Sequence, residues 1–492
     1  MFKTNVLVVF AVALLMSCST TKTSFYPEHK FAPEQLKKDF AILKETLEAN
    51  HPSLYWYTTK DSLDWLYDAI ATGITDSLTE AQFRNKVAYW VSNVHCGHTS
   101  TRASKAYIKY FEKKKLPLFP FNIKVWSDSA VVINNLLRND SALKRGTIIL
   151  AINNYSTSKI IDSISSLIST DGFSNNFKHQ AISFNFGAYY KNAFGIDSQY
   201  TIKYLDSNGL EHIHISKNYV YITDTAKKVI KKPVVLISKK QQKENELSAS
   251  RNMRIDSSKN MAVMEVNTFS KGKLRKFFRK SFNTLKEKKV QNLVIDLRRN
   301  TGGSISLSTL FTSYLAQKPF KIADTVAAQS RSFHNKKYIH HWLIYWMSLH
   351  LAGKRKQDNR IHFQYFEKGI FKPKKNNHFD GQVFLLIGGY TFSAATLVTN
   401  NLKGQQNVTI IGEETGGGSY GNSAIHIPDI VLPNSKIRVR LPLFRVVLNK
   451  NNPKTGRGIF PDIDTYPSSQ NIKKGIDNKM EKVIELIKSG GN

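Results

Sequence analysis

The stretch NLVIDLRRNTGG, residues 292–303, decides the fold of this chain. It begins as a short continuous apolar run, which is typical of a strand buried on both faces, and it ends in a glycine pair where the backbone can turn tightly. Around it, apolar runs of strand length alternate with segments whose apolar residues recur every three to four positions. Strands are predicted at 261–266, 292–297, 383–387 and 408–411, with helices at 274–286, 306–315 and 394–402. This alternation predicts an α/β core with crossover connections.

Before the core, the spacing of the apolar residues predicts first helices and then short strands. Helices are predicted at 33–49 and 63–70, and a third follows Thr79, whose T-x-x-Q arrangement resembles a capping box. Short β-rich runs come next, at 121–126, 130–133 and 147–152, closed by turn residues. We therefore expect a signal peptide (1–17), a helical domain (18–115), a β-rich domain (116–226), a basic link (227–251), the α/β core (252–470) and a C-terminal helix (471–492).

Composition excludes several protein classes. The chain has 492 residues, 41% of them hydrophobic, and only 2 cysteines. These values are not those of a disordered chain, a polytopic membrane protein or a disulfide scaffold. The 71 Lys+Arg against 37 Asp+Glu produce a net charge of +34, which favours encounter with anionic surfaces such as membrane head groups or acidic glycans. A basic surface without a dedicated partner is the alternative. No nucleic-acid recognition motif accompanies the charge, so no nucleic-acid partner is expected.

The first residues predict export and a lipid anchor. Eleven apolar residues from Val6 to Met16 are too few to span a bilayer and match the core of a secretory signal. Leu15-Met16-Ser17-Cys18 resembles a bacterial lipobox, in which Cys18 is lipidated and becomes the new N-terminus. The following residues lack the aspartate that retains lipoproteins in the inner membrane, so we expect an outer-membrane anchor facing the periplasm. The alternative is an ordinary signal peptide with a chance cysteine.

Two glycine-rich turns carry the chemistry. The first ends at Gly302-Gly303, where backbone N–H groups can approach a ligand and form an oxyanion hole. The second is GGYTFSAAT, residues 388–396, in which Ser393 and Ala394 begin a predicted helix. A serine hydroxyl there lies beside free N–H groups and the positive end of the helix dipole. Taken alone, a serine at this position is more often a simple helix N-cap.

Together these residues resemble the tail-specific, or C-terminal-processing, serine peptidases. Residues 296–303 match the family pattern DLRxNxGG, and residues 391–394 match Thr-x-Ser-Ala. The pattern GExTxGG begins at Gly412, and residues 458–462 match Gly-x-x-Pro-Asp. The resemblance implies a crotonase/Clp-like α/β protease core with an N-terminal helical domain. It also implies hydrolysis of peptide bonds in exported proteins or peptides, without a metal or an organic cofactor.

The β-rich domain resembles a PDZ module. Residues 146–154, GTIILAINN, followed by a predicted helix at 159–167, carry this resemblance. PDZ modules add an extended peptide to a sheet edge and hold its terminal carboxylate with backbone amides. The resemblance therefore implies substrates selected by their C-terminal ends, with a ligand-free β-rich insert as the alternative.

The family has two branches that differ in the catalytic base. The lysine branch places its base where this chain has Gly418. The other branch uses the histidine of a Gly-His-Thr, met here by Gly97-His98-Thr99, although Cys96 stands where an aspartate is usual. The resemblance thus implies Ser393 as nucleophile and His98 as base.

The resemblance also implies an oxyanion hole and leaves the orienting acid open. The N–H groups of Gly302, Gly303 and Ala394 are the implied donors to the oxyanion. The late glutamate of the histidine branch is missing from residues 454–457. The carboxylates considered as substitutes are Glu413, Glu414 and Asp462. A dyad without an acid is the alternative.

The same residues allow three other interpretations. His95, Cys96 and His98 have the chemistry of zinc ligands, but no second ligand pair at metal spacing follows. A Cys96 nucleophile is disfavoured because it lies on the same short loop as His98. Finally, retinoid-binding relatives of the family suggest a non-catalytic lipoprotein that binds a peptide or an apolar ligand, with the stretch YIHHWLIY, residues 338–345, lining the site.

Overall fold

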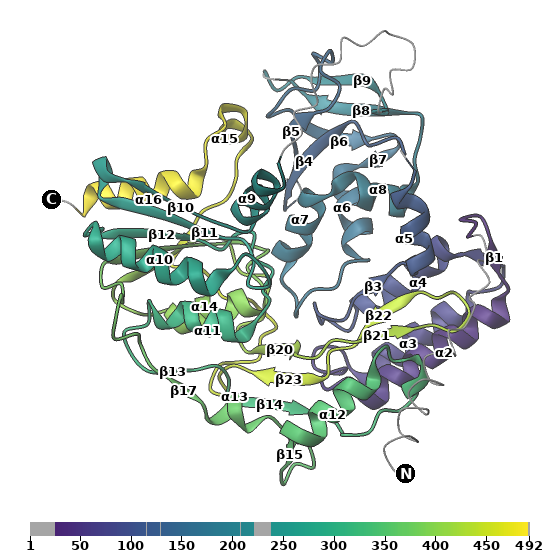
Figure 1. The fold of residues 1–492 in the computed structure, drawn as a ribbon. Coiled ribbons are helices and arrows are strands. Elements are labelled where there is room, and N and C mark those ends of the chain that lie inside the picture. The colour runs from purple at the N-terminus through teal and green to yellow at the C-terminus, as the bar shows by residue number, and fades with distance from the viewer. Residues whose placement is uncertain (1–24, 115, 128, 207, 221–237, 491–492) are drawn as a thin grey trace.

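The computed structural model describes residues 25–114, 116–127, 129–206, 208–220 and 238–490 (Figure 1). Its central element is a six-stranded sheet with the order β10-β11-β12-β18-β19-β24. The strands are β10 (Arg251–Asp256), β11 (Met261–Val266), β12 (Asn292–Asp296), β18 (Gln382–Ile387), β19 (Val408–Gly412) and β24 (Ile463–Asp464). All neighbours are parallel except β10, which runs antiparallel to β11. The four predicted core strands are confirmed, and β10 and β24 extend the sheet at its edges.

Helices cover both faces of this sheet. One face packs on α10 (Leu274–Glu287), α11 (Ile305–Ser313) and α14 (Ala394–Leu402), and the other on α16 (Asn478–Ser489) (Figure 1). Because successive side chains of a strand point to opposite faces, Leu293 and Ile295 of β12 lie in one apolar cluster and Val294 lies in the other. The continuous apolar run at 292–297 thus forms a strand buried on both sides, and the predicted mixed α/β core is confirmed.

The predicted N-terminal helices are confirmed as α2 (Pro33–Asn50), α3 (Lys60–Thr72) and α4 (Glu80–Ser92). Thr79 caps α4, and the predicted capping box with Gln82 is present. These helices share one apolar core with a second sheet, which the sequence did not predict. Its strands, in the order β15-β16-β14-β23-β20, are β15 (Lys354–Arg355), β16 (Ile361–His362), β14 (Thr325–Ala328), β23 (Phe444–Val447) and β20 (Gly421–Ala424).

The middle of the chain forms an antiparallel sheet with helices. The sheet consists of β4 (Phe121–Trp126), β5 (Ser129–Asn135), β6 (Ile148–Ile152), β8 (Gln199–Leu205) and β9 (Glu211–Lys217), and β7 (Tyr155–Ser156) pairs with β6. Its helices are α6 (Thr157–Ser165), α7 (Asn175–Phe184) and α8 (Phe186–Phe194). The sequence predicted only α6 among them. Helix α7 lies against the outer edge of β4, where the Val125 N–H donates to Ser183 Oγ (2.8 Å).

Other predicted segments differ from the structure or lie outside it. The signal peptide and Cys18 are not among the described residues, nor are residues 227–237 of the predicted link. The rest of that link is helical, as α9 (Lys239–Ser250). The predicted C-terminal helix is two helices, α15 (Ser469–Lys474) and α16, because Gly475 (φ 71°) ends the first in a left-handed conformation. Within the described ranges no helix is both long and apolar enough to cross a membrane.

The remaining elements are short. They are β1 (Lys30–Phe31), β2 (Leu78–Thr79), β3 (Thr101–Arg102), α5 (Lys105–Glu112), β13 (Phe320–Lys321), α12 (Trp342–Ala352), α13 (Gln364–Lys368), β17 (Ile370–Phe371), β21 (Asp429–Val431) and β22 (Arg438–Arg440), with single turns of 3-10 helix at Ser257–Lys259 and Lys336–Tyr338.

Candidate active site

The two glycine-rich turns meet at the carboxyl ends of the neighbouring strands β12 and β18. The Phe392 N–H donates to the carbonyl of Asn300 (3.1 Å), and the Thr391 hydroxyl donates to the carbonyl of Leu297 (3.0 Å). The Asn300 side chain in turn donates to the carbonyl of Val266 at the end of β11 (2.8 Å). These bonds hold the two turns as one unit.

Ser393 occupies a strained position at the N-terminus of α14. Its φ of 53° lies in the left-handed region, which residues other than glycine seldom adopt. Gly302 (φ 98°) lies directly against it, since a Cβ at Gly302 would stand 2.7 Å from Ser393 Cβ. The Ser393 side chain forms no capping hydrogen bond, so the interpretation of this serine as a simple N-cap is wrong.

His98 reaches Ser393 from the helical domain, 295 positions away in the sequence. His98 Nε2 lies 3.0 Å from Ser393 Oγ. The loop that carries His98 is closed by a hydrogen bond from the Thr99 N–H to the carbonyl of Cys96 (3.0 Å), and the chain then enters β3, which pairs with β22. The imidazole ring packs on Phe392, with 4.7 Å between the ring centroids. A nucleophile and a base therefore lie within hydrogen-bonding distance.

Burial dominates the electrostatics of His98. The residue is 5% exposed, and this burial, followed by the positive charge of Arg440, lowers the pKa of its imidazole to about 3. His98 Nδ1 is buried and has no hydrogen-bond partner among the described residues. The imidazole is thus neutral at neutral pH. The sequence did not indicate that Arg440 lies close enough to affect it.

None of the three carboxylates considered as the orienting acid reaches His98. Glu413 pairs with Lys479 Nζ (2.6 Å), and Glu414 pairs with Arg457 (2.5 Å). Asp462 accepts the Ile410 N–H (2.9 Å) and pairs with Lys403 (3.2 Å). The expectation that Glu413, Glu414 or Asp462 orients the base is therefore wrong. Each carboxylate is held by a cation on a neighbouring segment.

A carboxylate that the sequence analysis missed lies behind the histidine loop. Asp171, between α6 and α7, is 2% exposed and accepts the Gly97 N–H (2.8 Å). Its burial raises the pKa of the carboxyl to about 7. A Cβ at Gly418, where the lysine branch has its base, would lie 3.8 Å from Asp171 Cβ. In sequence, Asp171-Gly172 looks like a surface turn, so only the tertiary contact identifies it.

The backbone donors near Ser393 require one correction. The Gly302 N–H already donates to Asn300 Oδ1 (2.9 Å), so Gly302 is removed from the expected oxyanion hole. The N–H groups of Gly303 and Ala394 donate to no acceptor in the described part of the chain. Two donors therefore remain beside the nucleophile, which is sufficient for an oxyanion hole.

The other groups of the histidine loop face different partners. Cys96 is 5% exposed, and burial raises the pKa of its thiol to about 11, so the thiol stays protonated at neutral pH. His95 Nδ1 lies 3.0 Å from the carbonyl of Gly172. No group of three or more His, Cys, Asp or Glu side chains suited to a metal occurs within the described residues.

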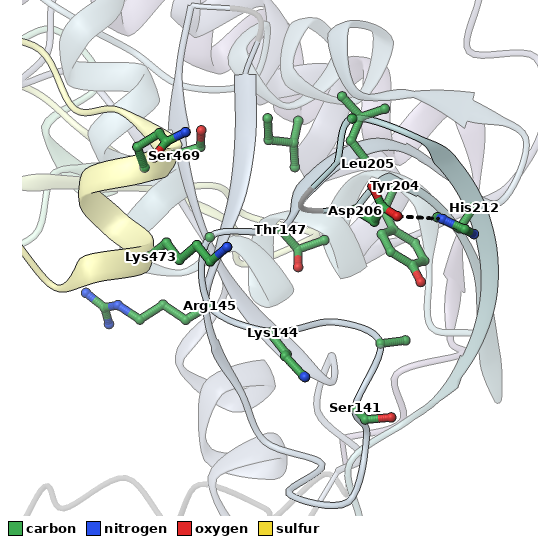
Figure 2. A pocket seen from close by; sticks show the side chains of 15 residues that line it. Ser141, Lys144, Arg145, Thr147, Tyr204, Leu205, Asp206, His212, Ser469 and Lys473 are labelled. Atoms are coloured by element: carbon green, nitrogen blue, oxygen red, sulfur yellow. Dashed lines mark hydrogen bonds and ion pairs between the residues drawn. The ribbon is translucent and has the colours of Figure 1, made fainter.

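A cavity outside the Ser393 site lies apart from these residues. Its volume is about 600 Å³. It is lined by residues of α15, of the turn before β6, and of β8 and β9 (Figure 2). Lys144, Arg145 and Lys473 line it, and His212 lies 3.0 Å from Asp206 on the opposite wall (Figure 2). None of its lining residues contributes to the Ser393 site.

Comparison with known proteins agrees with this geometry. Peptidase family S41 matches residues 260–465, and no curated protein sequence matches the chain. Among solved structures, mature CPAF superposes with a TM-score of 0.63 and 12% identity, covering 94% of this chain and 99% of CPAF. Mature CPAF complexed with lactacystin superposes with a TM-score of 0.62 and 14% identity, covering 92% and 98%. At these identities the superpositions establish a shared fold alone. The family match identifies residues 260–465 as a Peptidase family S41 domain, and the chain carrying this domain is a serine-type peptidase.

Proposed function

We propose that the chain hydrolyses peptide bonds with a Ser393–His98 dyad. The observation that carries the proposal is the 3.0 Å distance between Ser393 Oγ and His98 Nε2 at the end of β18. Ser393 Oγ attacks the scissile carbonyl while Nε2 takes its proton, and the N–H groups of Gly303 and Ala394 hold the oxyanion. The proton then passes to the leaving amine, and water hydrolyses the acyl-enzyme.

The dyad requires one tautomer of the imidazole. Nε2 must be the acceptor for the Ser393 hydroxyl, so the ring proton resides on Nδ1. The low pKa of His98 keeps the ring neutral and able to accept the proton. Asp171 acts as a positioning residue because it holds the N–H of Gly97, directly before His98.

Covalent labelling tests the dyad. A fluorophosphonate probe reacts only with an activated hydroxyl beside an oxyanion hole, so the native protein should be labelled and Ser393→Ala should not. His98→Ala should lower peptide hydrolysis by roughly a thousandfold or more. Ser489→Ala and His212→Ala, at exposed positions outside the site, are the matched controls. Equal labelling of the native protein and Ser393→Ala would remove Ser393 from the mechanism.

We infer that the enzyme is exported and anchored in the outer membrane through lipidated Cys18, facing the periplasm. The support is the signal sequence and the lipobox at residues 15–18. Fractionation of the native protein and of Cys18→Ala in high salt tests the anchor. The native protein should remain with the membrane, and its release into the soluble fraction would overturn the anchor.

Selection of substrates by their C-terminal ends is the finer proposal for the PDZ-like segment, residues 116–226. The β4 edge contacts α7, so strand addition there requires α7 to move or a peptide to use another edge. Amidating a good peptide substrate should raise its KM, because capture of the carboxylate by backbone amides is lost. Identical kinetics for the acid and the amide would reduce the segment to a spacer.

A further inference from the structure

Helix α12 carries apolar side chains around its whole circumference. No residue from Trp342 to Ala352 is a lysine, arginine, aspartate or glutamate. Its inner side packs on the core of the helical domain through Trp342, Tyr345 and the fully buried Leu349. A helix without a polar face is normally buried on all sides, and α12 is not.

The outer side of α12 is exposed although it is apolar. We call the four side chains concerned the α12 apolar face: Leu343 (51% exposed), Ile344 (63%), Met347 (48%) and Leu351 (82%). Residues 343, 347 and 351 are spaced four apart and form one column along the helix, with Ile344 beside it. Contiguous apolar surface of this kind marks an interaction site on a folded protein.

The charged residues that come shortly before and after α12 in the sequence are all cations. From Thr325 to Gln357 the chain contains six lysines and arginines and no aspartate or glutamate. Lys336 and Lys337 precede the helix, and their ammonium groups each lie 4.9 Å from the ring of Trp342 and Tyr338, respectively. Lys354 and Arg355 follow the helix in β15 and are exposed. Cations thus flank the α12 apolar face at both ends.

We propose that the α12 apolar face inserts into the interfacial region of an anionic lipid bilayer. Apolar side chains at the level of the head groups, with lysines and arginines on either side, are the pattern of a helix lying in a membrane surface. Trp346 on the same helix is exposed (37%) and is of the residue type that favours this depth. Figure 1 shows α12 and β15 together at the rim of the molecule, away from α15 and β9.

Charge distinguishes the bilayer from a second copy of the chain. In a two-fold dimer built on this face, the same cations would meet each other, because the interface would be the same patch on both subunits. Anionic head groups instead complement Lys336, Lys337, Lys354 and Arg355. A lipid at Cys18 would only tether the protein, whereas contact through α12 would orient it on the membrane.

Site-specific fluorescence tests the proposal on the full-length protein. Ile344→Cys is labelled with a nitrobenzoxadiazole group, and the matched control is Phe184→Cys, which is also helical and equally exposed (64%). Cys96 is buried and its thiol protonated, so it does not compete for the label. The vesicles are phosphatidylcholine with or without 30% phosphatidylglycerol and carry a nitroxide-labelled lipid. Both proteins also carry Cys18→Ala, so that the introduced cysteine is the accessible thiol and no lipid anchor contributes to binding.

The expected result is a blue shift and at least about threefold stronger nitroxide quenching at position 344 than at position 184 on the anionic vesicles. Lys336→Glu, Lys337→Glu, Lys354→Glu and Arg355→Glu together should abolish this difference, whereas Lys239→Glu with Lys240→Glu on α9 should not. Equal quenching at both labelled positions would overturn the proposal. A blue shift at position 344 that needs no vesicles and grows with protein concentration would also overturn it, because a second copy would then be the occupant.

Discussion

The pH dependence of peptide hydrolysis follows from the environment of His98. The general base must be neutral to accept the proton of Ser393, and kcat/KM reports the pKa of this base in the free enzyme. Burial and the charge of Arg440 lower that pKa from 6.5 to about 3. We therefore predict that kcat/KM stays close to its full value from pH 8 down to pH 5.

The expected difference is large. At pH 5, a base with an ordinary pKa would be only about 3% neutral, whereas a base with a pKa of about 3 would be about 99% neutral. The ratio of kcat/KM at pH 5 to that at pH 8 therefore differs about thirtyfold between the two cases. A fluorogenic peptide assayed across this range measures the ratio. Activity recovered after return to pH 8 checks that the protein stays folded, because a lowered histidine pKa makes folding less favourable as the pH falls below 6.5 toward 3.

Replacing Arg440 separates the two causes. Arg440→Gln removes a positive charge that opposes protonation, so the pKa of His98 should rise while burial, the larger cause, keeps it below 6.5. The acid limb of the profile, that is, the pH at which kcat/KM falls to half on the acidic side, should move up by about one pH unit. Arg445→Gln is the control, because Arg445 lowers the pKa of His51 rather than that of His98. A wild-type acid limb near pH 6.5 would refute the burial argument, and an unmoved limb in Arg440→Gln would refute the role assigned to its charge.

Three further predictions concern the same site. Gly302→Ala places a Cβ 2.7 Å from Ser393 Cβ at a φ that favours glycine, so kcat should fall roughly a hundredfold, and near-normal turnover would contradict this geometry. Asp171→Ala loses the acceptor for the Gly97 N–H and should lower kcat about tenfold or more. Asp171→Asn retains an acceptor oxygen, so its kcat should stay close to that of the native protein. Equal effects of the two substitutions would exclude a positioning role. Cys96, buried with a thiol pKa of about 11, should resist iodoacetamide in the native protein at pH 8 and react after unfolding, and rapid native labelling would contradict its burial.

The core strands were predictable because their apolar runs are continuous. The strand predicted at 261–266 is β11 and the helix predicted at 394–402 is α14, each with the same bounds in the structure. Burial on both faces imposes such a run on the sequence whatever the neighbouring strands are. The second sheet escaped prediction because its strands are only two to four residues long, and their pairing joins segments as distant as β14 and β23.

The two helices missed in the middle of the chain illustrate a related limit. Helices α7 and α8 are short, and much of their surface is covered by the neighbouring sheet and by aromatic contacts such as that between Phe186 and Phe119. Their apolar residues do recur at helical spacing, as Phe186, Tyr190 and Phe194 show in α8. The pattern spans only nine or ten residues in each helix, which is too short for periodicity alone to identify a helix.

The sequence by itself determined the turn after β12, because the glycine pair there adopts positive φ values that other residues seldom take. It also placed Ser393 at the start of a helix, although Ser393 does not cap that helix. It also contained the Gly97-His98-Thr99 motif, although nothing local brings His98 to Ser393. Only the tertiary structure decided the electrostatics of that pair. The pKa of a buried group depends on the charges and dipoles around it in space, and these come from segments remote in sequence. For this reason the expected acids are held by lysines and an arginine, while Asp171 and Arg440 lie beside the histidine loop.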